Sequence, residues 1–223
     1  MKKNLTHVEA EAITRRVGEV EARTGVELVA AIVAKSHAYP QLPWKAFALA
    51  VSLAGCVIVV ADALRPDWVT ASTVSLQTAG VLIAGAAAAL FAVFVPPFAR
   101  LFLRRPRREF EVRRYAQTVF LDREVFATRG RTGVLLLVSV FEHRVEILPD
   151  RGFAPRVNDA DWRRVIARMT PLLRERRPAD AVLAGLAAAE AMLLEKGFAP
   201  GAIERDELPD RPIDTSGPRE VDA

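Results

Sequence analysis

Two long apolar segments in the first half of the chain constrain its fold more than any other feature. Residues Ala46–Ala61 read AFALAVSLAGCVIVVA, and neither this stretch nor the longer one from Val69 to Ala99 contains a charge. A transmembrane helix needs roughly 20 predominantly apolar residues. Trp44 and Lys45 extend the first segment, because the ring and the amine can lie at the headgroup level. We therefore predict a hairpin of two transmembrane helices, Ala46–Ala61 and Val74–Val95.

The distribution of basic residues predicts how this hairpin is oriented. Seven arginines and two glutamates lie between residues 100 and 114, whereas the linker Asp62–Ser72 contains a single arginine, Arg65. Basic residues in short flanks remain on the cytoplasmic side of a membrane. The prediction is a protein of the inner (cytoplasmic) membrane with both termini in the cytoplasm and the linker outside.

The arginines that follow the second span have a predicted partner of their own. Basic residues next to a span attract anionic lipid headgroups. A nucleic-acid partner is not expected, because no aromatic or glycine-rich binding module accompanies them. The residues predicted to contact headgroups are Arg100, Arg104, Arg105, Arg107 and Arg108.

The rest of the composition excludes several classes of protein. The chain is 51% apolar yet 26% charged, which requires that its apolar residues be concentrated in segments. Cys56 is the only cysteine, so neither a disulfide nor a cysteine metal site can form within one chain. Charged residues follow Lys2 and Lys3 without an apolar core, so we expect no cleaved signal peptide.

Helix and strand patterns flank the hairpin on both sides. An amphipathic helix over Leu5–Thr24 precedes a strand over Val26–Ala34, and the order recurs as a helix over Glu109–Thr128 and a strand over Val134–Val140. A third strand, Val145–Leu148, follows a hairpin turn, and two further helices end near Gly197. Continuous apolar strands indicate a sheet that is covered on both faces.

These elements predict an α/β fold, with a small sheet of about four strands flanked by helices and a transmembrane hairpin inserted into it. The predicted α/β domain is split in sequence. Its first part spans residues 1–40 and its second part 107–203, with the hairpin at 44–99 between them. Residues 204–223 are charged and contain three prolines, which predicts a disordered polar tail.

The C-terminal half resembles the TPM domain, a family of phosphatase-like α/β domains that are often tethered to membranes. The resemblance is carried by the strand–turn–strand segment Thr132–Phe153, by Trp162 and by the helix Asp180–Lys196. Residues Thr24–Val29 are similar to the first strand of the family's domain, and Asp206–Asp210 to its acidic end. The commoner family pattern has a Gly-x-Gly turn, whereas this chain has Asp150 at the first of those positions.

The resemblance implies where a catalytic or metal site would lie. Family members implicated in phosphate-ester hydrolysis or in binding divalent cations use acidic residues near the loop after the hairpin turn. Here that loop supplies Asp150, Asp159 and Asp161 as candidate ligands for Ca²⁺ or Mg²⁺, which prefer oxygen ligands. The alternative interpretation is structural: Asp150 forms a turn, and Asp159 and Asp161 complement a helix N-terminus.

Other chemistry-bearing residues receive structural interpretations. Glu142 and His143 are expected to be solvated in a hairpin turn, and Ser139 lies in an apolar strand without a Gly-x-Ser-x-Gly elbow. No phosphate-binding Gly-x4-Gly-Lys loop is present. Whether the chain is an enzyme is left open by its sequence.

Two functions are therefore carried forward. The first is a membrane-anchored regulatory or protein-interaction module, with the bilayer and a membrane or cytoplasmic protein as its partners. The alternative is a divalent-cation-dependent phosphatase, which the resemblance alone implies. Transport is disfavoured, because two helices enclose no pathway and carry no charge at mid-membrane.

Overall fold

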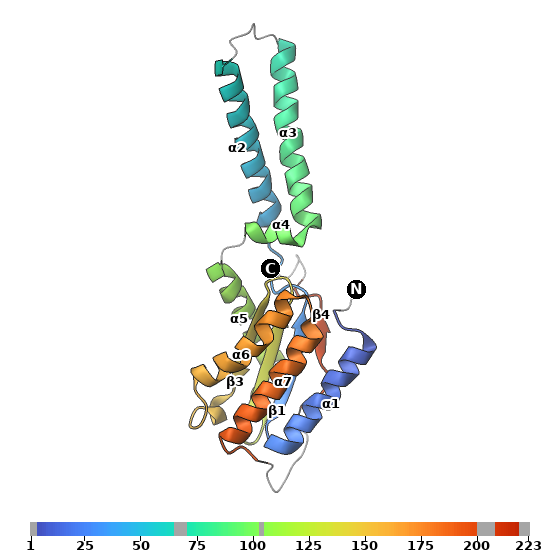
Figure 1. Cartoon of the computed structure of the whole chain (residues 1–223), viewed down its shortest axis with the longest axis vertical. Coiled ribbons are helices and arrows are strands. Elements are labelled where there is room, and N and C mark those ends of the chain that lie inside the picture. The colour runs from blue at the N-terminus through green and yellow to red at the C-terminus, as the bar shows by residue number, and fades with distance from the viewer. Residues whose placement is uncertain (1–3, 65–70, 103–104, 200–207, 219–223) are drawn as a thin grey trace. The chain divides into compact units, whose positions relative to one another are not determined.

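The computed structural model describes residues 4–64, 71–102, 105–199 and 208–218 of the chain. The chain divides into two compact units (Figure 1). The α/β unit comprises Met1–Ala38 together with Arg108–Ala223, and the helical hairpin comprises Tyr39–Arg107. A segment inserted into one loop of the first unit thus forms the second.

The α/β unit is built on a four-stranded mixed sheet. Its strands are β1 (Glu27–Val33), β2 (Gly133–Ser139), β3 (Arg144–Pro149) and β4 (Ile213–Thr215), in the order β3-β2-β1-β4. The strand β1 pairs in parallel with β2 and β4, and β2 pairs with β3 in the antiparallel sense. The predicted α/β fold with a small sheet of about four strands is confirmed.

Three helices cover one face of this sheet (Figure 1). They are α1 (His7–Thr24), α6 (Asp159–Arg174) and α7 (Pro178–Glu195). Side chains of successive strand residues point to opposite faces. Leu28, Ala30 and Ile32 of β1 therefore join the core beneath these helices, together with Leu136 and Val138 of β2.

A single helix, α5 (Arg105–Asp122), covers the other face. The alternate residues of β1, Val29, Ala31 and Val33, pack in a second core with residues of α5 such as Val112 and Ala116. Two 3-10 turns, Val125–Ala127 and Arg151–Phe153, flank β2 and β3. Both faces of the sheet are covered, and β1 after Glu27 and β2 before Ser139 are apolar without interruption.

Capping residues set the ends of the helices. The Thr6 hydroxyl accepts a hydrogen bond from the Glu9 N–H while the Glu9 carboxylate accepts one from the Thr6 N–H, which is a capping box. Gly25 ends α1 in the left-handed region at φ 65°. Asn158 and Asp161 form the same reciprocal box at the start of α6.

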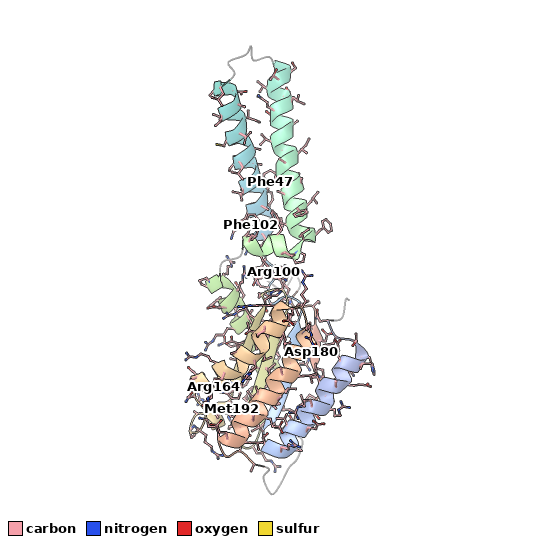
Figure 2. All side chains as sticks on the ribbon, in the orientation of Figure 1. Phe47, Arg100, Phe102, Arg164, Asp180 and Met192 are labelled. Atoms are coloured by element: carbon pink, nitrogen blue, oxygen red, sulfur yellow. The ribbon has the colours of Figure 1, made fainter. Side chains whose placement is uncertain are left out.

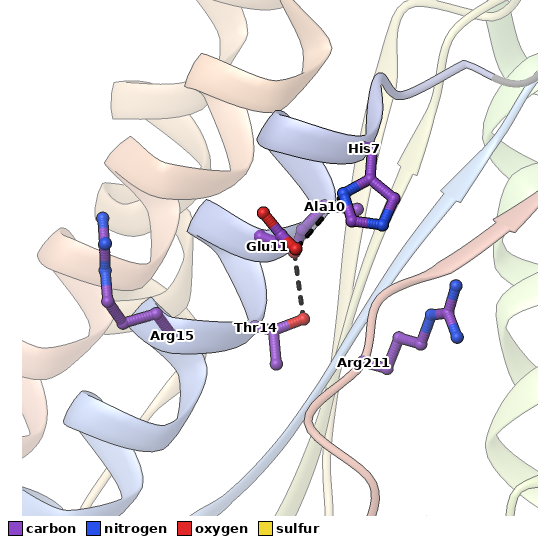
Figure 3. Close-up of a pocket in the computed structure, with 6 residues that line it drawn as sticks. All are labelled: His7, Ala10, Glu11, Thr14, Arg15 and Arg211. Atoms are coloured by element: carbon purple, nitrogen blue, oxygen red, sulfur yellow. Dashed lines mark hydrogen bonds and ion pairs between the residues drawn. The ribbon is translucent and has the colours of Figure 1, made fainter.

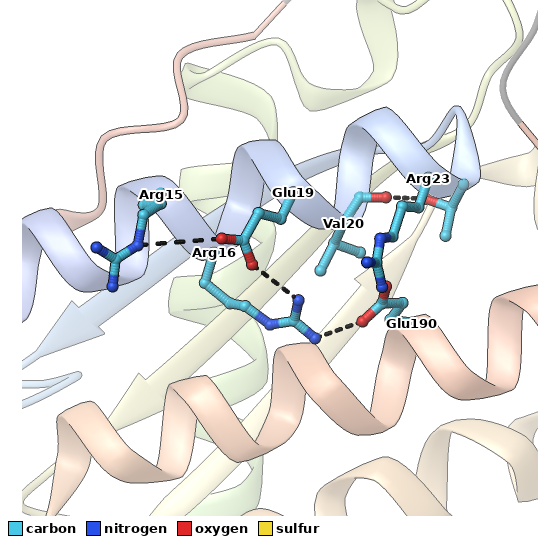
Figure 4. Close-up of polar contacts among 7 residues, drawn as sticks. Arg15, Arg16, Glu19, Val20, Arg23 and Glu190 are labelled. Carbon is cyan, nitrogen blue, oxygen red and sulfur yellow. Dashed lines mark hydrogen bonds and ion pairs between the residues drawn. The ribbon is translucent and has the colours of Figure 1, made fainter.

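An ion-pair cluster joins α1 to α7 (Figure 4). The Glu190 carboxylate of α7 is paired with Arg16 and Arg23 of α1, the latter at 3.0 Å. Burial by itself raises the pKa of Glu190, but hydrogen bonds from Arg23 and Arg16 outweigh it, so the pKa lies below its usual value. These two ion pairs fix how α1 and α7 lie beside each other on the sheet.

The C-terminal segment differs from the predicted disordered tail. Residues 208–218 run along the outer edge of β1, where β4 pairs with Ala31–Val33. The Asp214 carboxylate accepts hydrogen bonds from the backbone N–H of Asn4 and Leu5, and Leu208 and Ile213 pack in the second core. The buried apolar residues of this segment offset the conformational entropy that is lost when it becomes ordered. Its charged composition had suggested that it could not bury enough apolar surface to do so.

The helical hairpin consists of α2 (Gln41–Leu64), α3 (Ala71–Phe94) and the short α4 (Pro96–Leu101). Both α2 and α3 have 24 residues and are long and apolar enough to cross a membrane. The helix α2 begins five residues before the predicted span at Ala46, because Trp44 and Lys45 continue its turns. The predicted tight linker at 62–72 lies largely outside the described residues.

Gly85 lets the two long helices approach each other closely. A Cβ added at Gly85 would lie 2.6 Å from the Val51 side chain and 2.7 Å from that of Phe47, so glycine permits this close approach. Gly55 and Gly80 have nothing within 4 Å of an added Cβ. Of these three glycines, only Gly85 lies at the contact between α2 and α3.

Candidate functional site

The carboxyl ends of the parallel strands β1 and β2 form the first place to look for a site. In open α/β sheets, ligands bind outside the carboxyl ends of the strands. Val33 and Ser139, the last residues of the two strands, are paired in register. Polar residues therefore gather at this edge, from Lys35 to His37 after β1 and from Ser139 to His143 at the end of β2.

A buried polar cluster lies at this edge, formed by Ser36, Ser139 and Glu142. The Glu142 carboxylate accepts the Ser36 N–H at 3.0 Å and the Ser139 hydroxyl, and the two serine hydroxyls are 2.8 Å apart. The Glu142 side chain is only 1% exposed. The expectation that Glu142 is solvated is therefore wrong. The left-handed His143 (φ 51°) tightens the turn and folds Glu142 back onto the strand ends.

Backbone hydrogen bonds clamp the exit of β1 from both sides of this cluster. The N–H groups of Val140 and Phe141 donate to the carbonyls of Val33 and Ala34, and the Ala34 N–H donates to Thr215, each at 2.9 Å. The Lys35 ammonium donates to the Ala38 carbonyl and lies 5.4 Å from the centre of the Phe141 ring. This segment leads directly into α2, so the clamp fixes the point where the chain leaves the sheet.

One further pair of titratable groups lies close by. His37 Nδ1 is 3.7 Å from Glu111 Oε2 of α5, and both side chains are largely buried. The Ser139 hydroxyl, in contrast, is fully buried at the strand end and is therefore closed to a substrate. The arrangement can hold the strand ends and α5 together, and it presents no accessible nucleophile for acyl or phosphoryl transfer.

The structure places Asp150 in a turn beside β2. Its Oδ1 accepts the Arg151 N–H at 2.7 Å, and its Oδ2 lies 3.0 Å from Arg131 Nε. Gly152 must remain a glycine here, because an added Cβ would lie 2.5 Å from the Arg131 carbonyl oxygen. The carboxylate thus neutralises Arg131, whose backbone is in the left-handed region, and caps the start of the 3-10 turn Arg151–Phe153.

The structure places Asp161 in the first turn of α6, where it is 2% exposed. Its carboxylate accepts the Asn158 N–H at 3.0 Å and pairs with Lys196 at 2.9 Å and with Arg164. These contacts, the Asn158 hydrogen bond first and then Lys196, lower the pKa of Asp161 to about 2. Asp159 is exposed on the same turn.

The three aspartates are therefore not brought together. Within the described part of the chain, no group of three or more His, Cys, Asp or Glu side chains is arranged to hold a metal ion. Asp150 and Asp161 have cationic partners of different elements instead. The predicted Ca²⁺ or Mg²⁺ site at Asp150, Asp159 and Asp161 stays a prediction, and the observed contacts match its structural alternative.

Asp161 makes the stability of the α/β unit dependent on acid pH. A folded-state pKa below the usual value adds stability above about pH 4, which is lost as the pH falls towards 2. We expect Asp161→Asn to be less stable than the wild type at pH 7, and the difference to shrink at pH 3. Denaturant unfolding at the two pH values checks this. Asp159→Asn, on the same turn but exposed, should show no such pH-dependent difference.

The arginines predicted to contact lipid headgroups are described in part. Arg100 lies in α4 and Arg107 and Arg108 in the first turn of α5, where Arg107 is exposed. Arg104 lies outside the described residues, and Arg105 begins α5. All five follow the end of α3 within fourteen residues along the chain, and their contact with lipid headgroups stays a prediction.

A hollow of about 420 Å³ lies between α1 and the C-terminal segment (Figure 3). It is lined by His7, Glu11, Thr14, Arg15 and Arg211, with Ala10. His7 and Glu11 are 3.2 Å apart, and both are mostly exposed. Glu11 and Arg15 of α1 and Arg211 of the C-terminal segment border the hollow, and we assign no ligand to it.

The sequence did not point to Ser36 as a neighbour of Glu142, or to Glu111 as a neighbour of His37. Ser36 and Ser139 become neighbours only because β1 and β2 pair in parallel with their ends level. A repeated motif in the sequence could have indicated this pairing. Arg-Thr-Gly-Val occurs at residues 23–26 and 131–134 and marks two equivalent helix-to-strand junctions.

Comparison with known proteins bears on this fold. Residues 92–192 match the family model of the TPM domain. The TPM match includes the strand–turn–strand segment Thr132–Phe153, Trp162 and most of α7, which also carried the resemblance seen in the sequence. Residues Thr24–Val29 and Asp206–Asp210 lie outside it.

A solved structure is similar over nearly the whole chain. It is the NMR structure of the BA42 protein from the psychrophilic bacterium Bizionia argentinensis. The similarity has a TM-score of 0.55 at 16% sequence identity and covers 95% of this chain and 94% of the other. At this identity the likeness shows the fold alone. The comparison with curated proteins gives no match.

Proposed function

We propose that this protein is a regulatory module of the cytoplasmic membrane, anchored by its helical hairpin, whose α/β unit binds another protein on the cytoplasmic side. The observation that carries the proposal is the apolar exterior of the hairpin. Leu53 of α2 and Leu76 and Ile83 of α3 are 59%, 76% and 68% exposed. Exposed apolar surface on this scale marks a membrane or protein interaction site.

The orientation follows from the flanking charges. The arginine cluster 100–108 follows the second span, where anionic headgroups would attract each basic residue by about 1 kcal/mol. This attraction and the single arginine of the linker support an orientation with both termini on the cytoplasmic side. The α/β unit, whose two parts flank the hairpin in sequence, then faces the cytoplasm.

The interaction role rests on how the polar groups of the α/β unit are used. Asp150 and Asp161 bind arginine or lysine, and Glu142 is enclosed by serines. These groups stabilise turns, helix starts and strand ends. A rigid scaffold with its loops and helix faces exposed is suited to protein recognition.

The sole cysteine provides a direct test of membrane insertion. Cys56 is exposed in the middle of α2, so in water it would react readily, whereas in a bilayer its thiol is shielded and hard to ionise. We expect a membrane-impermeant maleimide to label Cys56 in intact membranes at least about tenfold more slowly than after denaturation in detergent. Rapid labelling in intact membranes would refute the anchor.

A matched cysteine tests the orientation. In a Cys56→Ser background, Val8→Cys places a thiol on the exposed side of α1. It should be labelled in inside-out vesicles and protected in right-side-out vesicles or intact spheroplasts; the reverse pattern would refute cytoplasmic termini. Repeated recovery of the solubilised protein as a lone monomer would count against the partner.

The second candidate is divalent-cation-dependent hydrolysis of phosphate esters, which the TPM match favours. A generic phosphate ester assay with Ca²⁺ or Mg²⁺ decides between the two functions. Hydrolysis that disappears in Asp150→Asn and with a chelator would establish the enzyme. Hydrolysis that survives both treatments would exclude Asp150 as its metal ligand.

A further inference from the structure

The outer side of α6 carries a group of exposed arginines, of which only Arg164 contacts another side chain of the described structure. Trp162, Val165, Met169 and Leu173 form the buried side of this helix. Arginines occupy the opposite side, and all of them are exposed. We call them the α6 arginine face: Arg163, Arg164, Arg168 and Arg174 (Figure 2 labels Arg164).

Helix geometry spreads these arginines over a broad outer face. Arg163 and Arg174 are eleven residues apart, so they lie about three turns and roughly 16 Å apart on one edge of this face. Arg164 and Arg168 are one turn apart on its other edge, roughly 100–140° around the helix from Arg163. The exposed residues between them, Ala167 and Pro171, are small and leave the guanidinium groups accessible.

The described structure gives these arginines almost nothing to bind. Arg164 pairs with Asp161, whereas Arg163, Arg168 and Arg174 form no hydrogen bond or ion pair within the described part of the chain. The guanidinium groups of these three exposed arginines are therefore available to a partner outside the described part of the chain.

The composition of the face selects the class of partner. A helix that lies on a bilayer combines its basic residues with exposed large apolar side chains, and none of the large apolar residues of α6 is exposed. Asp159 and Asp161 occupy the helix N-terminus, where a nucleic-acid phosphate would otherwise bind. The remaining class of partner is a protein with exposed carboxylates, because each carboxylate can accept two parallel N–H bonds from a guanidinium.

We propose that the α6 arginine face docks an acidic segment of another protein. This inference rests on the proposed interaction function, for which it names the surface and the chemistry of the partner. Long-range attraction between the face and the acidic segment would speed their encounter and weaken with added salt.

Two measurements on the full-length protein test the proposal. The first uses the protein in neutral lipid nanodiscs and a fluorescent, helical, glutamate-rich peptide as the probe. The triple variant Arg163→Glu, Arg168→Glu, Arg174→Glu should raise the dissociation constant by at least about tenfold, because three attractive pairs become repulsive. The control variant Arg15→Glu, Arg123→Glu, Arg211→Glu makes the same change in net charge elsewhere on the protein. It should change the dissociation constant of the peptide by less than about twofold.

The second measurement is photo-crosslinking in cells, with a photoreactive residue in place of Ala167 on α6 or Gln117 on the exposed side of α5. The proposal expects an adduct at Ala167 with an acidic protein segment, lost in the triple variant. An adduct with lipid or nucleic acid, or equal weakening of the peptide by both triple variants, would overturn it. Adducts at Gln117 with none at Ala167 would overturn the α6 assignment and leave the proposed interaction function standing.

Discussion

Gly133→Ala should strongly destabilise the α/β unit. A Cβ at this position would lie 1.9 Å from the Val125 carbonyl oxygen, far inside van der Waals contact. The obstacle is backbone, so no side-chain rotation relieves it. Gly133 also opens β2, which pairs with both β1 and β3, and its carbonyl accepts the Asp150 N–H at 2.9 Å.

The expected loss of unfolding free energy is about 4 kcal/mol or more, since overpacking that side chains can relieve already costs 1–3 kcal/mol. That is a large share of the roughly 5–15 kcal/mol that stabilises a typical domain. Pulse proteolysis of the full chain in urea measures it. Gly130→Ala, three residues earlier, meets only the Thr132 side chain at 3.1 Å and should change stability by less than about 1 kcal/mol. Equal stability of the two variants would show that Val125 can move away.

Glu142→Ala should be the most damaging truncation at the strand ends. It would leave the Ser36 N–H and the Ser139 hydroxyl buried without their acceptor. Each unsatisfied buried group costs about 1–3 kcal/mol, so we expect a loss of about 2–4 kcal/mol. Urea unfolding measures it, while the labelling of Cys56 should be unchanged because the hairpin is a separate unit.

Glu146→Ala is the matched control, four residues away on β3. Burial raises the pKa of Glu146 despite Arg113 and Arg144 nearby, so its ionised form is disfavoured where it lies. Its removal should be close to neutral or slightly stabilising at pH 7. If Glu142→Ala were as mild as this control, the buried cluster would not be holding the strand ends.

The local patterns of the sequence predicted most of the helices and strands. The amphipathic pattern over Leu5–Thr24 predicted α1, and the continuous apolar runs predicted β1 and β2. The hairpin helices were predicted from the absence of charge. These features depend on neighbours within a few residues, and the sequence displays them directly.

Features that depend on distant residues were missed. The strand β4 has only three residues, and it forms because β1 offers an open edge and because Asn4 and Leu5 donate to Asp214. Its charged, proline-containing context predicted disorder. Glu142 was expected in water, because its burial depends on Ser36, more than 100 residues away.

The sequence by itself determined the α/β class, the apolar hairpin inserted within it and the helix caps, since hydrophobic periodicity and capping are local. Tertiary structure alone decided which polar groups are buried together and which remain free. It paired Asp150 with Arg131 and Asp161 with Lys196, whereas the resemblance in the sequence had suggested that these aspartates share one metal site. It also left the arginines of α6 exposed, because the burial of Met169 and Leu173 turns the opposite side of the helix to solvent. Pairing of polar groups depends on their distance in three dimensions. Strand order and helix packing set this distance, and spacing along the chain does not reveal it.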